Sequence, residues 1–235
     1  NPTGYSIYKN EAPLIAAAIK EAAQFGKVVA VVDDAYYSLF FDDYMLTESI
    51  FSYLAGLHDN ILAIKVDGAT KEEFVWGLRV GFLTYGVKSV GDPAALYKAL
   101  EQKTAGCLRA SISNVSNLSQ NLVLKALNHP EFETQKQQKL ATMKARAKET
   151  QRVLESRPEF KEVWDYYPFN AGYFMCLKLH SIKANDLRLK VLNDYGVGTI
   201  SLGPTDLRVA FSCLNINQIA DVFDLIYKAA KDLQK

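Results

Sequence analysis

The sequence predicts an α/β domain with a mostly parallel sheet, followed by a smaller C-terminal α+β domain. In the first half of the chain, short valine- and isoleucine-rich runs alternate with segments in which apolar residues recur at helical spacing. This alternation is typical of parallel strands connected by covering helices. The pattern of predicted strands and helices changes beyond residue 157. We therefore expect a large domain over residues 1–130, a long connecting helix over 131–157 and a small domain over 158–235.

The first predicted helix covers residues 11–24, where apolar residues follow helical spacing and Gly26 comes next as a C-terminal stop. A valine-rich run at residues 28–32 follows, flanked by Gly-Lys and by two aspartates. An uninterrupted apolar run of this length is typical of a strand covered on both faces. Residues 61–64 and 79–85 are the next strand candidates.

Helical periodicity returns from residue 93, over 116–126 and over 131–156. The last of these segments has a Lys- and Gln-rich face, but glutamates intersperse the charge and no aromatic residues interleave with it. We interpret this face as solvated rather than as a nucleic-acid-binding stripe. In the small domain, strands are expected at 172–179, 197–200 and 207–211, and helices at 184–194 and 216–233.

Composition narrows the class of protein. A hydrophobic content of 49% is ample for a buried core, and 27 basic against 26 acidic residues point to neither nucleic acid nor an anionic membrane as partner. The apolar stretches are too short to span a bilayer, and the histidines lack ligand spacing for a metal. Cys107, Cys176 and Cys213 lie in apolar contexts, which predicts buried free thiols in a cytoplasmic protein.

Lys71 and Arg79 stand eight positions apart in a segment that is otherwise largely apolar and punctuated by glycine. A lysine amine can act as a covalent catalyst, and an arginine guanidinium is a planar fork suited to phosphate. The spacing therefore suggests a Schiff-base lysine beside a phosphate clamp. The plainer alternative is a surface lysine next to Glu72 and Glu73.

Asp33 and Lys71 fall just past the ends of predicted strands, where ligands gather in open α/β sheets. Tyr36 follows Asp33, and Arg208 lies near the end of the chain. With an Asn-Pro-Thr-Gly opening, these residues offer the polar contacts that a pyridine ring with a phosphate tail needs. Each has a plainer alternative: a helix cap for Asp33, a core aromatic for Tyr36 and a strand end for Arg208.

Taken in order along the chain, five pieces resemble the class I/II pyridoxal-phosphate aminotransferases of fold type I, from Asn1 to the C-terminal helix. The pieces are Asn-Pro-Thr-Gly at the start, Asp-x-x-Tyr at Asp33 and Tyr36, Lys71 with Arg79 and Gly81, Arg109-x-x-x-Ser113-Asn114, and Arg208.

The resemblance implies that Lys71 forms the Schiff base with pyridoxal 5′-phosphate and moves the proton at the substrate α-carbon. It also implies that Asp33 pairs with the pyridine nitrogen as a buried carboxylate. Tyr36 and Asn1 would hydrogen-bond the phenolic oxygen of the ring.

For the phosphate, the resemblance implies a guanidinium contact from Arg79. Many relatives have a serine three residues before the lysine, and this chain has Gly68 there, which leaves Thr70 as a substitute donor. For the substrate, Arg208 would bind the α-carboxylate and Phe174 would pack against it. Arg109 would bind a dicarboxylate side chain across a dimer interface, or form a structural salt bridge.

The implied activity is the transfer of an amino group between an L-amino acid and a 2-oxo acid, in a homodimer. A β-lyase or decarboxylase on the same scaffold, or a non-catalytic ligand-binding module of a regulator, are the alternatives. Because Asn-Pro-Thr-Gly lies near the middle of such chains, the resemblance implies a C-terminal portion with a partial large domain. We expect such a portion to be inactive alone, to expose apolar surface and to self-associate.

Overall fold

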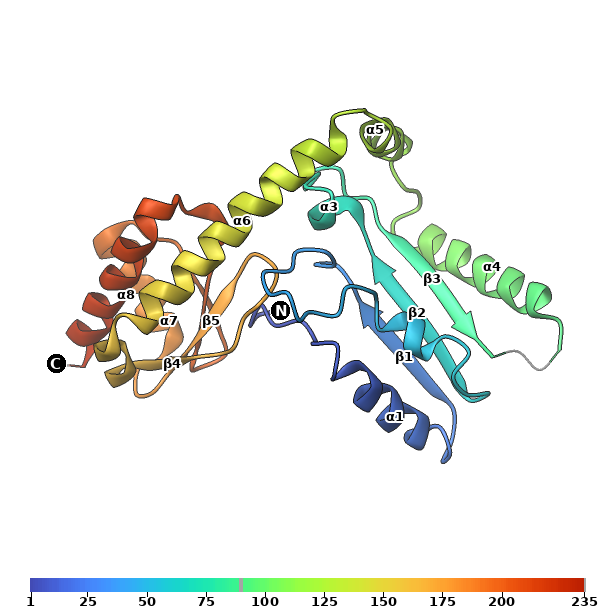
Figure 1. The fold of residues 1–235 in the computed structure, drawn as a ribbon, viewed down its shortest axis with the longest axis horizontal. Helices are drawn as coiled ribbons and strands as arrows, with labels where there is room; N and C mark the ends of the chain where they lie inside the picture. Colours follow the sequence, from blue (N-terminus) through green and yellow to red (C-terminus); the bar gives the residue numbers. More distant parts are fainter. Residues whose placement is uncertain (89–90, 235) are drawn as a thin grey trace. The chain divides into compact units, whose positions relative to one another are not determined.

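A computed structural model describes residues 1–88 and 91–234, and the chain divides into two compact units (Figure 1). Unit 1 comprises Asn1–Ser6, Leu39–Asp43 and Gln137–Lys235, and unit 2 comprises Ile7–Ser38 and Tyr44–Lys136. Unit 1 thus includes two short N-terminal segments that no linear division of the sequence assigns to it. The predicted domain limits at residues 130 and 157 stay predictions.

Unit 2 contains a three-stranded sheet in the order β1 (Val28–Asp33), β2 (Ile61–Asp67) and β3 (Phe82–Val87). β1 and β2 are parallel, as expected, and β2 and β3 are antiparallel. The predicted third strand begins at Phe82 instead of residue 79, because Arg79 has a φ of 55° and cannot belong to an extended strand.

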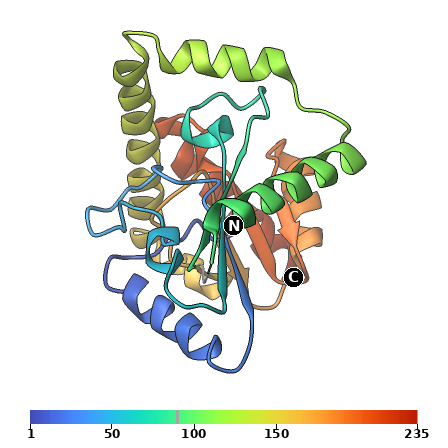
Figure 2. The same ribbon diagram turned by 90° about the vertical axis from the view of Figure 1, so that its right-hand side faces the viewer.

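Unit 2 also contains helices. They are α1 (Ala12–Ala22), α2 (Phe51–Leu54), α3 (Ala69–Glu72), α4 (Pro93–Ser111), α5 (Asn117–Leu127) and the start of α6 (Phe132–Glu155). α1 and α2 cover one face of the sheet, where Ala16, Leu54, Val32 and Ala63 form a buried cluster. α4 lies beside β3 (Figure 1, Figure 2), and the Tyr85 and Thr104 hydroxyl oxygens are 2.6 Å apart there.

The prediction that β1 is covered on both faces is wrong. Val29 and Val31 are 60% and 62% exposed, while Val32 is buried. Alternate side chains of a strand point to opposite faces. The cluster on α1 and α2 covers only the face that carries Ala30 and Val32.

Unit 1 contains an antiparallel sheet in the order β4 (Trp164–Tyr166), β5 (Met175–Leu179), β7 (Asp206–Val209), β6 (Ile200–Leu202). It also contains most of α6, together with α7 (Ala184–Tyr195) and α8 (Ile219–Leu233). α8 is strongly amphipathic and buries one face. The buried residues of this face are Ile219, Val222, Phe223, Ile226, Ala229 and Ala230.

The predicted burial of the cysteines is confirmed for Cys176 and wrong for Cys107 and Cys213, which are exposed. Cys107 lies on α4, a helix that buries none of its residues. Burial raises the pKa of the Cys176 thiol to about 11, which keeps it protonated and unreactive near neutral pH. Within the described residues, no helix combines the length and apolar character that a membrane span requires.

Candidate functional site

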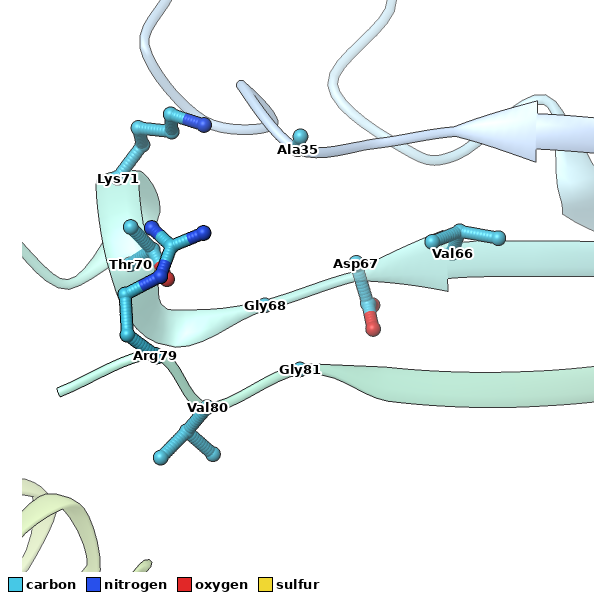
Figure 3. Close-up of a pocket in the computed structure, with 9 residues that line it drawn as sticks. All are labelled: Ala35, Val66, Asp67, Gly68, Thr70, Lys71, Arg79, Val80 and Gly81. Carbon is cyan, nitrogen blue, oxygen red and sulfur yellow. The ribbon is translucent and has the colours of Figure 1, made fainter. Parts of the chain in front are cut away.

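A pocket lies in unit 2 where β2 ends and β3 is about to begin (Figure 3). Its volume of about 240 Å³ is just below the roughly 300–1,000 Å³ of small-molecule pockets, so it suits one end of a ligand. Lys71, Thr70 and Arg79 bring an amine, a hydroxyl and a guanidinium to it. The lining residues are Ala35, Val66, Asp67, Gly68, Thr70, Lys71, Arg79, Val80 and Gly81.

Lys71 is the third residue of α3, four positions past the end of β2. Ala69, at the start of α3, is buried with Val80 and Val123. The Lys71 Nζ lies 4.7 Å from the centroid of the Tyr36 ring, a distance at which an ammonium is attracted to the aromatic face. In Figure 3 the Lys71 side chain extends toward Ala35. The short helix therefore presents the amine to the pocket and to Tyr36.

Arg79 enters the same pocket from the other side of the β2–β3 connection. Its φ of 55° is a left-handed conformation that costs a residue with a side chain about 1–3 kcal/mol. The connection is tight as well as strained: a β-carbon at Gly68 would lie 2.7 Å from the Val80 carbonyl oxygen and 3.1 Å from the Gly81 Cα. Only glycine permits this approach, which sets Thr70 and Arg79 at one pocket.

Asp33 ends β1 with an exposed side chain, and its Oδ1 accepts a hydrogen bond from the Ala35 N–H at 3.1 Å. It is not among the residues that line the pocket. The buried carboxylate expected at this position is therefore not what the structure shows for Asp33. Its neighbour Asp34 is half-buried, and Asp34 Oδ2 has no hydrogen-bond partner within the described residues.

Two acidic side chains near the pocket have raised pKa values. Burial is the largest cause for Asp34, whose pKa rises above the usual 3.8 although a hydrogen bond with Ser49 and the charge of Lys65 oppose the shift. Burial also raises the pKa of Glu72 above 4.5. Asp67 forms an ion pair with Lys65, and its carboxylate points away from the Lys71 amine in Figure 3. No group of three metal-ligating side chains is found among residues 1–88 and 91–234.

A second set of predicted residues lies together in unit 1. Arg208, on β7, donates a hydrogen bond from Nη1 to Asn1 Oδ1 at 2.9 Å, and its Cζ lies 4.2 Å from the centroid of the Phe174 ring. Gly4 has a φ of 79°, and a β-carbon there would lie 2.1 Å from the Phe174 carbonyl oxygen. The glycine of the opening motif is thus required by conformation and by space, and it lets the N-terminal segment pack beside Phe174.

Arg109 joins neither set. It lies exposed on α4, and its Nη1 donates to Ser113 Oγ at 2.8 Å, a local contact within the segment that the sequence singled out. Both interpretations of Arg109 stay open.

The structure thus brings together Thr70, Lys71, Arg79 and Tyr36 in unit 2, and Asn1, Phe174 and Arg208 in unit 1. The apolar wall of the pocket, Ala35 and Val66, was not predicted. The signal was available, because both residues adjoin aspartates at the ends of predicted strands.

Comparison with known proteins finds a matching family. The sequence model of a family described as aminotransferase class I and II matches residues 1–226. No curated protein sequence matches the chain.

Three similar solved structures illustrate the fold. An aminotransferase from Anaerococcus prevotii has a TM-score of 0.76 at 22% identity, over 98% of this chain and 54% of that one. The α-aminoadipate aminotransferase of Thermus thermophilus, in complex with N-(5′-phosphopyridoxyl)-L-leucine, has a TM-score of 0.75 at 23% identity, over 100% of this chain and 57% of that one. An aspartate aminotransferase from Thermotoga maritima has a TM-score of 0.71 at 18% identity, over 100% and 54%.

The chain therefore spans a little over half the length of these proteins. At such low identity the likeness shows the fold alone, and it confirms the predicted fold class.

Proposed function

We propose a function for this chain from its family, since the chain belongs to the aminotransferase class I and II family. It carries the reactive lysine of an enzyme that transfers an amino group between an L-amino acid and a 2-oxo acid. The observation that supports this best is the pocket shared by Lys71, Thr70 and Arg79 at the end of β2. The whole protein is proposed to act as a homodimer. A β-lyase or decarboxylase would need the same lysine, so the acceptance of the amino group by a 2-oxo acid is the decisive property.

The residues of the pocket fit pyridoxal 5′-phosphate. An amine can hold its aldehyde covalently, and a guanidinium with a hydroxyl can bind its phosphate. Position 68 has no room for the serine that many relatives have there, because an added β-carbon would lie 2.7 Å from the Val80 carbonyl oxygen. Arg79 and Thr70 are therefore the phosphate donors that we propose. When bound, the cofactor supplies an electron sink that stabilises negative charge at the substrate α-carbon.

We assign Lys71 two tasks: to hold the cofactor through Nζ and to move the proton at the substrate α-carbon. The Tyr36 ring at 4.7 Å gives the amine a fixed neighbour. The Tyr36 hydroxyl is proposed to hydrogen-bond the phenolic oxygen of the cofactor. Asp33 is exposed and does not line the pocket, and its proposed role is to offer a carboxylate to the pyridine nitrogen from the end of β1.

In unit 1, Arg208 is proposed to bind a substrate carboxylate through two parallel hydrogen bonds, which a planar guanidinium favours. The Phe174 ring under its face and the bond to Asn1 Oδ1 hold the guanidinium in one orientation. Asn1 is thus supported as a residue that orients Arg208. Its predicted contact with the cofactor ring stays a prediction.

The test is covalent capture. The chain is titrated with pyridoxal phosphate while the visible absorbance is followed, then reduced with borohydride, and the modified peptide is identified by mass spectrometry. We expect modification at Lys71 and an absorbance shift when an amino acid is added, and we expect recovery of the amino group on a 2-oxo acid from the whole protein. Lys71→Ala should lose both, and Lys139→Ala, at an exposed lysine of α6, should keep both. Equal capture by Lys71→Ala would exclude the assignment.

A further inference from the structure

The turn that carries Lys71 is joined to α6 by an ion pair that the sequence did not predict. Lys136 Nζ donates a hydrogen bond to Glu73 Oε1 at 3.1 Å and lies 3.0 Å from Oε2. The two side chains are only 17% and 15% exposed. Both residues belong to unit 2, although 63 positions separate them. The pair is therefore shielded from solvent much more than an ordinary surface salt bridge.

The helix that holds Lys71 is too short to be stable by itself. α3 has four residues, and an isolated helical turn is unfavourable because nucleation fixes several residues for one hydrogen bond. The backbone after it is also strained, since Phe74 has a φ of 52°. The position of Lys71 must therefore come from contacts outside α3.

Two such contacts bracket Lys71. On the N-terminal side, Ala69 is buried with Val80 and Val123, the latter on α5. On the C-terminal side, Glu73 follows α3 directly and takes the ion pair with Lys136. Lys71 lies between the apolar contact and the ionic one. Loss of either contact frees one end of the turn.

The charge of Lys136 affects two neighbouring carboxylates and not only its ion-pair partner. Glu72 and Glu73 are adjacent carboxylates, and the positive charge of Lys136 acts on both, lowering the pKa of Glu72 against the effect of burial and of Glu73. Without Lys136, two like charges would be left close together in a half-buried place, which is unfavourable. Removing the ammonium should thus displace this end of the turn, and not merely delete one bond.

We propose that Glu73 and Lys136 are a positioning pair that holds the Lys71 amine at the pocket. Neither side chain lines the pocket, so they act through the backbone of α3 and not on a ligand. The inference rests on the proposed function where pyridoxal phosphate is the probe, and it also makes a prediction that needs no cofactor.

The experiment compares Glu73→Gln, Lys136→Met, the charge exchange Glu73→Lys with Lys136→Glu, and the conservative Lys136→Arg. Lys139→Met, an exposed lysine on the same helix, is the matched control. The first readout is the rate at which acetic anhydride labels Lys71, relative to the other lysines, as a function of pH. The second is capture of pyridoxal phosphate by Lys71. Amide exchange in β1 and β2 shows whether the sheet remains folded.

We expect each single neutral variant to change the labelling profile of Lys71 and to weaken capture by about 5- to 30-fold. Lys136→Arg and the charge exchange should restore most of both, and Lys139→Met should match the wild type. The inference is overturned if the neutral variants keep the Lys71 profile with β1 and β2 folded, or if Lys136→Arg fails as completely as Lys136→Met. If the wild type captures no cofactor while labelling still depends on the pair, the proposed function fails and the positioning role stands.

Discussion

Units 1 and 2 differ in how many large side chains they bury completely. Of the twelve largest fully buried side chains among the described residues, only Met45 and Leu54 lie in unit 2. Unit 1 holds the others, including Trp164, Phe211 and Phe223. Since burial of apolar area is the main favourable term in folding, unit 1 gains more stability from its hydrophobic core.

Unit 2 holds the residues with strained backbone. The four non-glycine residues with positive φ in the described chain all belong to it: Ser38, Phe74, Arg79 and Ser113. Buried polar atoms that no described residue hydrogen-bonds occur in both units, for example Asp34 Oδ2 and Asp67 Oδ1 in unit 2 and Trp164 Nε1 in unit 1. Backbone strain often gathers at functional sites. The unit with the pocket therefore has fewer large buried side chains and more strained backbone than the other unit.

The largest expected effect concerns the core of unit 1. Phe223→Ala should destabilise that unit by about 3–5 kcal/mol, because a fully buried ring leaves a cavity. Val31→Ala in unit 2 should change stability by about 0.5 kcal/mol or less, since the side chain is 62% exposed.

The two tryptophans allow the units to be followed separately by denaturant titration, because Trp164 lies in unit 1 and Trp76 in unit 2. Replacement of one tryptophan by phenylalanine leaves the other as the reporter. Similar losses for both variants would erase the contrast between the units.

A smaller effect is expected at the β2–β3 connection. Gly68→Ala should cost unit 2 about 1–3 kcal/mol, because its β-carbon would overlap the Val80 carbonyl and force a backbone shift. Gly26→Ala is the matched control, as nothing lies within 4 Å of a β-carbon there. Urea titration read at Trp76 measures both. A Gly68→Ala chain as stable as the control would show that the connection is looser than its geometry indicates.

The smallest effect is the response to pH, and its sign should differ between the units. Burial raises the pKa of Asp34 and Glu72 in unit 2, so the folded state binds protons more tightly than the unfolded state. Between the folded pKa values and the usual 3.8 and 4.5, unit 2 should gain stability as pH falls.

In unit 1, hydrogen bonds from Arg152 and Lys231 lower the pKa of Glu149 and Glu162 below 4.5. Their stabilising contribution is present above 4.5 and is lost as pH falls through the lowered values. Amide exchange as a function of pH measures each unit. Asp34→Asn should abolish part of the response of unit 2 only, and parallel responses in both units would contradict the assignment.

The sequence predicted most helices and strands because they are long enough to show a period. α2, α3 and β4 have three or four residues and show none. Which face of a strand is covered depends on helices elsewhere in the chain, so the exposure of Val29 and Val31 was out of reach of a local pattern.

For the functional site too, the sequence predicted local relations between residues and not long-range ones. Lys71 and Arg79 could be paired from the sequence because they lie in one connection between consecutive strands. Arg208 and Asn1 are 207 residues apart, and only the resemblance to a family linked their roles. Glu73 and Lys136 show no periodic or motif signal, because an ion pair between distant segments leaves no local trace.

The valines of β1 have a consequence for handling the chain. β1 is an outer strand of its sheet, and no strand of the described residues pairs with its outer edge. The same strand carries two exposed valines on one face. A β-branched edge of this kind is a template on which another copy can add a strand and begin to polymerise. Lysine at position 29 or 31 would act as a gatekeeper against such growth, at a site remote in sequence from Lys71 and Arg79.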